Sequence, residues 1–104
     1  MQIERLPRCE EQVMAVIWKS EGASDLMTTM ERVNAEFCHT WKPQTVSTFL
    51  RRLVKRGYLS DYRQGRYTYY RPAVGREAYK AAVMEEFKRT FGEVNMCLAE
   101  KGMS

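Results

Sequence analysis

The hydrophobic pattern of this chain changes its period at Gly57. Before that glycine, apolar residues recur at the spacing of one helix face: Val46, Phe49, Leu50, Leu53 and Val54. After it, β-forming residues fill the runs 58–63 and 66–71, which are joined at Gln64-Gly65 as in a hairpin turn. The fold therefore has to contain a helix, residues 43–56, that is followed directly by a two-stranded hairpin.

Most of the remaining chain has helical periodicity. Residues 10–19 carry a wide apolar stripe, and Ser24 is a suitable N-cap for a second helix that ends near residues 37–39. A longer helix is expected over residues 74–91, and a weakly patterned tail follows. This order predicts a mostly α fold with a small β-hairpin, namely a winged helix-turn-helix domain over residues 1–72 and a C-terminal helical region over residues 73–104.

Length and charge limit the number of domains and the kind of partner that this chain can have. A chain of 104 residues can close one core with a short appendage, and its net charge of +4 suits a polyanionic partner. The Lys and Arg residues are concentrated between Lys42 and Lys80, where Asp61 is the only acid before Glu77. No apolar run is long enough to span a membrane and no secretory signal is present, so we expect a cytoplasmic protein without a membrane partner.

The polar side of the helix at 43–56 is the first candidate site. It carries amide, hydroxyl and cationic groups and no acid: Gln44, Thr45, Ser47, Thr48, Arg51, Arg52 and Lys55, with Lys42 just before the helix. Gln44 and Arg51 can make bidentate contacts to base edges, and short hydroxyl side chains let a helix approach DNA closely. This pattern favours a helix that enters the major groove, although a cationic helix face is often only a solvated surface.

The hairpin supplies a second candidate site. Arg63 and Arg66 flank the expected turn at Gln64-Gly65, where they can neutralise phosphates. The tyrosines of the two strands are interpreted as cross-strand pairs and core cover rather than as a platform for stacked bases.

The long helix at 74–91 carries an apolar stripe that a small winged domain has no means of covering. Its members are Val74, Ala78, Ala82, Val83, Phe87 and Phe91. We expect a second copy of the chain to cover them, which predicts a homodimer. The alternative is that this helix folds back onto the first helix of its own chain.

Three segments resemble the penicillinase and methicillin-resistance repressors of the BlaI/MecI type and their copper-responsive CopY relatives. They are "LPRCEEQVMAVIW" at 6–18, "WKPQTVSTFLRRLVKRGYL" at 41–59 and "RQGRYTYYRPAV" at 63–74. The resemblance implies a homodimeric repressor that blocks a promoter by occupying a palindromic operator.

Several residue roles follow only from this resemblance. It implies that Gln44, Thr45, Ser47, Thr48 and Arg52 meet the operator, that Gly65 and Arg66 belong to the wing, and that residues 74–98, including Val94 and Leu98, form the dimer. In relatives a regulatory protease cuts within the dimerisation region. We find no cleavage signature after Gly92, so the inducing signal stays open.

Other functions are less well supported by the residues. The winged helix could serve as a protein-interaction module, or the chain could sense redox state through Cys9, Cys38 or Cys97. A lone Cys97 does not make the paired C-terminal cysteines of the copper-responsive branch, so we expect no metal and no cofactor. The single histidine and the absence of a phosphate-binding glycine loop disfavour an enzyme.

Overall fold

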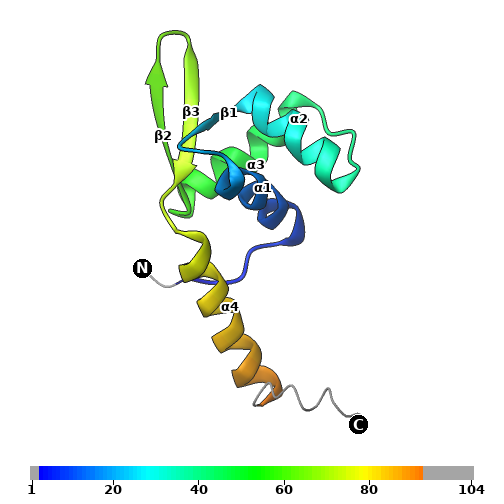
Figure 1. Cartoon of the computed structure of the whole chain (residues 1–104), viewed down its shortest axis with the longest axis vertical. Coiled ribbons are helices and arrows are strands. Elements are labelled where there is room, and N and C mark those ends of the chain that lie inside the picture. Colours follow the sequence, from blue (N-terminus) through cyan, green and yellow to red (C-terminus); the bar gives the residue numbers. More distant parts are fainter. Residues whose placement is uncertain (1–2, 93–104) are drawn as a thin grey trace. The chain divides into compact units, whose positions relative to one another are not determined.

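The computed structural model describes residues 3–92, which form two compact units. The first is Leu6–Arg76, and the second contains residues 3–5 and the chain from Glu77 onward. The elements in chain order are α1 (Arg8–Lys19), β1 (Ser24–Asp25), α2 (Leu26–Phe37), α3 (Pro43–Lys55), β2 (Leu59–Gln64), β3 (Tyr67–Pro72) and α4 (Arg76–Phe91) (Figure 1). Three helices followed by a hairpin confirm the element order of a winged helix-turn-helix.

The core of the first unit lies between its three helices and the base of the sheet. Its fully buried members come from all three helices: Glu10, Val13, Met14, Val16 and Ile17 of α1, Thr29 and Val33 of α2, and Val46, Leu50 and Leu53 of α3. Phe49 and Val54, the other two residues of the expected core face of α3, are half-buried. The apolar stripe therefore fixes which side of α3 turns inward, and the opposite side is left to solvent.

The end of α3 follows from Gly57. This glycine has φ +86°, and the N–H groups of Gly57 and Tyr58 donate to the carbonyls of Val54 and Leu53 at 3.0 and 2.9 Å. Such a pair of bonds closes a helix when a residue after its end adopts a left-handed conformation, which glycine does without steric cost. The chain can therefore pass from α3 into β2 without a longer loop.

The start of α2 differs from the prediction. Asp25 is the N-cap, because its Oδ1 accepts a hydrogen bond from the Thr28 N–H at 2.8 Å. Ser24 instead lies in β1 and is buried, with its Oγ 2.8 Å from the Thr29 Oγ1. The expected cap at Ser24 is therefore wrong by one residue.

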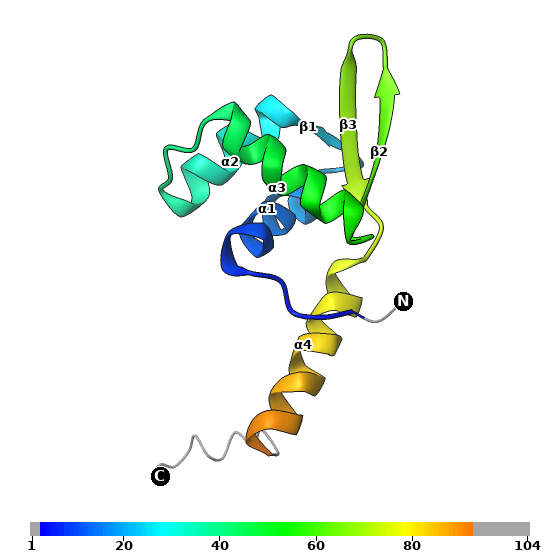
Figure 2. The ribbon, with the colours of Figure 1, turned by 180° about the vertical axis from the view of Figure 1, so that it is seen from behind.

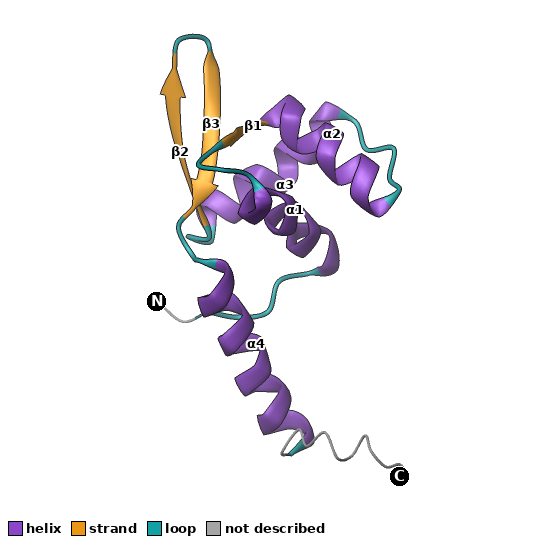
Figure 3. Ribbon diagram, viewed as in Figure 1, coloured by secondary structure: helices purple, strands orange, loops and turns teal. Residues whose placement is uncertain are grey.

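The sheet has three antiparallel strands in the order β1-β3-β2 (Figure 3). The expected hairpin is β2 and β3, and Tyr62 pairs with Tyr69 across it with ring centroids 5.6 Å apart, which confirms the cross-strand tyrosine pair. The added strand β1 places Ser24 opposite Tyr70 and Asp25 opposite Tyr69. The base of β3 is thus paired on both edges.

The hairpin turn lies one residue later than expected. Gln64 pairs with Tyr67, so the turn residues are Gly65 and Arg66 instead of Gln64 and Gly65. Gly65 has φ +68°. A left-handed first residue is typical of two-residue hairpin turns whose twist matches that of the strands.

The segment between α2 and α3 is held by side chains. The Asn34 amide donates to the Trp41 carbonyl at 3.1 Å, and its oxygen accepts from the Trp41 N–H at 3.0 Å. The Trp41 ring lies between His39, 4.1 Å away and nearly parallel, and Phe49 of α3 at 5.1 Å. His39 is also hydrogen-bonded to Gln12 of α1 at 2.7 Å. These contacts fix the residue that immediately precedes Lys42 and α3.

The second unit consists of α4 and residues 3–5. Hollows of about 370 and 150 Å³ lie between them, the first lined by Ile3, Arg5 and Ala82 among others, and the second by Arg5, Val83 and Phe87. No helix within residues 3–92 is long and apolar enough to cross a membrane.

Candidate nucleic-acid interface

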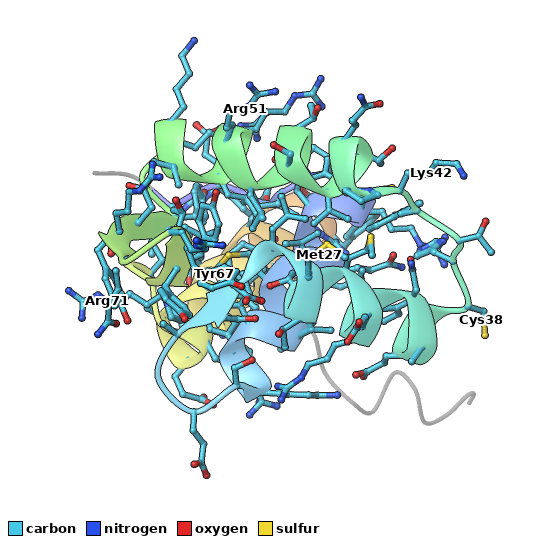
Figure 4. The ribbon with its side chains drawn as sticks, turned by 90° about the horizontal axis from the view of Figure 1, so that it is seen from above. Met27, Cys38, Lys42, Arg51, Tyr67 and Arg71 are labelled. Atoms are coloured by element: carbon cyan, nitrogen blue, oxygen red, sulfur yellow. The ribbon has the colours of Figure 1, made fainter. Side chains whose placement is uncertain are left out.

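The outer side of α3 presents the polar residues that the sequence singles out. Lys42, Gln44, Arg51, Arg52 and Lys55 are exposed, and Thr45, Ser47 and Thr48 are partly exposed between them. Arg51 projects from the side of α3 that faces away from α2, and Lys42 lies at the beginning of the helix (Figure 4). Viewed from behind, α3 lies in front of α1, so this side is uncovered within the 6–76 unit (Figure 2).

The hydroxyl of Thr48 on this face already makes a hydrogen bond within α3. The Thr48 Oγ1 donates to the Gln44 carbonyl of its own helix at 3.0 Å. Its hydrogen is used in this geometry, but the oxygen keeps lone pairs. Thr48 is therefore suited to accept a hydrogen bond from a base amino group rather than to donate one to a phosphate.

An acid from another helix lies beside this face. Glu10 of α1 is 2 % exposed, and its carboxylate oxygens lie 3.7 Å from Nη1 of Arg52 and of Arg56. The helix α3 contributes no acid to this face. Glu10 of α1, however, adds a negative charge beside it. Sequence reasoning missed both Glu10 and Arg56. The only available signal was the spacing of Arg52 and Arg56, which puts them one turn apart on the same flank.

The hairpin tip carries the second group of candidates. Arg63 at the end of β2, Gly65 and Arg66 are all exposed. Because the turn is Gly65-Arg66, Arg66 lies in the turn itself and Arg63 lies opposite Thr68. Arg63 therefore belongs to β2, and Arg66 is the turn residue that directly precedes β3.

The base of the hairpin shares an electrostatic environment with α3. Burial raises the pKa of the Tyr70 hydroxyl, the neighbouring negative charge of Asp61 raises it further, and the positive charge of Arg51 lowers it. Asp61 is paired with Tyr70 across the hairpin. The positive charge of Arg51 on α3 therefore acts on a side chain of β3.

Known proteins share both the sequence and the fold. The family model for the penicillinase repressor matches residues 6–100. The chain belongs to the penicillinase repressor family. The penicillinase repressor of Bacillus licheniformis is 30 % identical over 91 residues, which cover 86 % of this chain and 67 % of that protein.

Two solved structures of penicillinase repressors resemble the fold. The solution structure of the DNA-binding domain of the repressor BlaI has a TM-score of 0.63 and 31 % identity, and covers 76 % of this chain and 94 % of that one. The Bacillus licheniformis BlaI monomer in complex with the blaP half-operator has a TM-score of 0.61 and 31 % identity, and covers 75 % and 92 %. The winged-helix assignment is therefore confirmed.

The residues expected to form the dimer in this penicillinase repressor homologue lie in different environments. Phe87 and Phe91 are 43 % and 71 % exposed, with ring centroids 4.7 Å apart, and Met84 beside them is 46 % exposed. Ala78 is exposed, while Ala82 and Val83 are half-buried and line the hollows beside residues 3–5. Val94 and Leu98 lie outside the described residues.

Val74 does not belong to α4. It is 7 % exposed within the 6–76 unit and precedes the helix, which begins at Arg76. Its carbonyl accepts a hydrogen bond from Nε1 of Trp18 at 3.0 Å, and its N–H donates to the Tyr58 carbonyl at 3.2 Å. Val74 thus packs inside the first unit, and we leave it out of the surface that a second copy would cover.

The structure describes two of the three cysteines of this penicillinase repressor homologue. Residues 3–92 contain no group of three or more side chains that could hold a metal ion. Cys9 is half-buried and Cys38 is exposed, at φ +58° just after α2. Cys97 lies outside the described part of the chain. The redox-sensing alternative stays a prediction.

Proposed function

We propose that this chain is a transcriptional repressor that binds operator DNA through α3 and the hairpin, and that it acts as a homodimer. The observation that carries the proposal is the orientation of α3. Its three buried residues, Val46, Leu50 and Leu53, hold the helix so that its cationic side faces solvent. The blaP half-operator in the BlaI complex supports the same partner.

Each part of the surface has a separate role in this mechanism. Gln44 and Arg51 project from the outer side of α3, where paired donors and acceptors can read base edges in the major groove. Lys42, Lys55 and Arg66 neutralise phosphates, which sets the register of the protein on the duplex but carries no sequence information. Two such surfaces in a dimer bind the two halves of a palindromic operator and exclude the transcription machinery from the promoter.

The DNA-binding proposal is tested with three variants that each remove one positive charge. Arg51→Gln alters the α3 face, Arg66→Gln alters the hairpin tip, and Lys19→Gln is the control, because Lys19 pairs with Glu36 on the surface of α1 and α2. Binding is measured by fluorescence anisotropy, across a range of salt concentrations, on a duplex selected from a random pool and on a scrambled duplex.

The two roles predict different results. Arg51→Gln is expected to weaken binding to the selected duplex by about 1–3 kcal/mol while sparing the scrambled one. Arg66→Gln is expected to weaken both equally and to reduce the slope of log K against log salt by about 0.9, the value for one neutralised phosphate. If both variants bind both duplexes as Lys19→Gln does, this surface is not the interface.

The dimer proposal rests on the exposed apolar side of α4. Met84, Phe87 and Phe91 together leave a larger apolar area in solvent than single scattered side chains do, and a second α4 is a natural cover. Phe87→Ala with Phe91→Ala is expected to convert a dimer to a monomer in sedimentation equilibrium. Operator affinity is expected to fall with it, because the two half-sites are then bound independently.

The matched control for the dimer is Lys88→Ala, which changes an exposed polar residue of the same helix. A double phenylalanine variant that sediments as the wild type does would contradict the proposal. A repressor of this kind is a regulator rather than an enzyme and acts in the cytoplasm, with its DNA. The regulatory protease implied by the resemblance stays a prediction.

A further inference from the structure

Glu10 is the only charged side chain that is buried among residues 3–92. It lies on α1, it is 2 % exposed, and its Oε1 has no hydrogen-bond partner in the described part of the chain. A buried carboxylate that lacks donors is costly unless nearby cations compensate its charge. The position of Glu10 therefore depends on the cations beside it.

Those cations both belong to α3 and its C-terminal cap. Nη1 of Arg52 lies 3.7 Å from Oε2 of Glu10, and Nη1 of Arg56 lies 3.7 Å from Oε1. Both distances exceed those of ordinary N–H···O hydrogen bonds, so the contacts are ion pairs without direct hydrogen bonds. The carboxylate is thus enclosed by protein on one side and by two guanidinium groups on the other.

The two arginines also face solvent, with side chains 57 % and 47 % exposed. A guanidinium carries five N–H donors in a planar fork, so it can bind one anion through one edge and a second anion through another. Arg52 lies on the flank of the α3 face proposed to contact DNA, beside Thr48 and Lys55. A DNA phosphate or base edge can therefore be the second partner of a guanidinium whose first partner is Glu10.

We propose that Glu10 is a positioning residue for DNA recognition, which holds the Arg52 guanidinium at the edge of α3 before the operator binds. This inference rests on the proposed function. An arginine that is ordered in advance loses less conformational entropy on binding, and it is held in the one geometry that suits the correct sequence.

The direct test is Glu10→Gln, which keeps the shape of the side chain and removes its charge. The control is Glu31→Gln, which makes the same charge change at an exposed position of α2. We expect the ratio of operator affinity to scrambled-duplex affinity to fall about tenfold in Glu10→Gln, a coupling typical of residues in contact. Glu31→Gln is expected to leave that ratio unchanged.

A double-mutant cycle then separates positioning from a general loss of structure. On an Arg52→Gln background, Glu10→Gln is expected to have no further effect on the affinity ratio, because the residue that it positions is gone. A fall that persists on that background, or an equal change in both affinities, would overturn the inference.

A second pair of variants retains Glu10 and so does not depend on whether Glu10→Gln folds. Arg52→Lys and Arg56→Lys each keep a positive charge beside the carboxylate but lose the planar fork. Only Arg52 lies on the proposed DNA-binding face, so only Arg52→Lys is expected to lower the affinity ratio. Equal ratios for the two lysine variants would refute the role of Glu10.

Failure of this inference can be told apart from failure of the proposed function. If the wild-type chain binds operator in a salt-dependent manner but the Glu10 variants behave as their controls do, only the positioning role is refuted. If the wild-type chain shows no salt-dependent binding to any duplex, DNA binding itself is refuted.

Discussion

Replacement of Asn34 by alanine tests whether the contacts before α3 hold this helix in place. The side chain of Asn34 makes two hydrogen bonds to the backbone of Trp41, of 3.1 and 3.0 Å, across seven residues. Each hydrogen bond of this kind contributes about 0.5–1.5 kcal/mol net, so Asn34→Ala is expected to cost about 1–3 kcal/mol. Since Asn34 is only partly buried, water can replace some of these bonds in the variant, and we expect a value in the lower half of this range.

The assay is thermal unfolding followed by circular dichroism. In a domain of this size a destabilisation of about 1 kcal/mol lowers Tm by roughly 4–8 °C, so the variant should melt roughly 4–16 °C below the wild type. Glu31→Ala is the control, because it introduces alanine at an exposed position of the same helix. Operator affinity measured well below both melting temperatures is also expected to fall, since Trp41 directly precedes Lys42 and α3.

The reasoning would be refuted if Asn34→Ala melted at the same temperature as Glu31→Ala. That result would mean that the stacking of Trp41 on His39 and Phe49 alone holds the turn. Reduced stability with unchanged operator affinity would show instead that the contact stabilises the fold without positioning α3.

Three further predictions concern single features of the 6–76 unit. Thr29→Val should destabilise by about 1–3 kcal/mol in urea unfolding, because it leaves the buried Ser24 hydroxyl without its 2.8 Å partner, and adding Ser24→Ala should restore part of the stability. Gly65→Val should cost about 1–2 kcal/mol in the same measurement, since φ is +68° there, whereas Gly65→Asn should cost less. The pKa of Tyr70 is raised by burial and by Asp61, so its neutral form is favoured in the folded state, and the resulting stability is full below pH ~10 and is lost as pH rises through the folded pKa. Tyr70→Phe should therefore lose less stability than the wild type when unfolding is measured at increasingly alkaline pH, and an identical loss would contradict this.

The elements that could be predicted from the sequence are those whose pattern is local. The buried residues Val46, Leu50 and Leu53 repeat at helical spacing, and the glycine at 57 ends the helix in a conformation that other residues adopt at a cost. The cap of α2 could not be resolved in this way, because Ser24 and Asp25 are both good caps. In the structure the Ser24 hydroxyl is buried and bonded to Thr29, and Asp25 makes the cap hydrogen bond to Thr28.

The position of the hairpin turn could not be decided from the alternation of residues along the two strands. Turns at Gln64-Gly65 and at Gly65-Arg66 differ by two residues in strand register, so each strand residue keeps its side of the sheet in both. Leu59 and Tyr70 would lie on the same side of the sheet with either turn, and glycine is accepted at either position of a two-residue turn.

The candidate site was predicted where it depends on one helix and missed where two helices meet. The exposed positions of Arg51 and Lys55 follow from the stripe on the other side of α3. In the sequence alone, Glu10 is not distinguishable from an ordinary exposed acid in the first turn of a helix. Its burial results from the packing of α1 against α3, and only the spacing of Arg52 and Arg56 indicated an anion beside them.

The strand β1 is only two residues long, and it pairs with Tyr69 and Tyr70 at the base of β3. Toward the tip, from Arg63 and Thr68 outward, the hairpin is a two-stranded ribbon within the described unit. A ribbon twists more easily than a three-stranded sheet, so the wing is stiff where it joins the helices and pliant where it carries Arg66. If the hairpin contacts DNA as proposed, such a wing would adapt to duplexes of different shape while α3 keeps its place on the core.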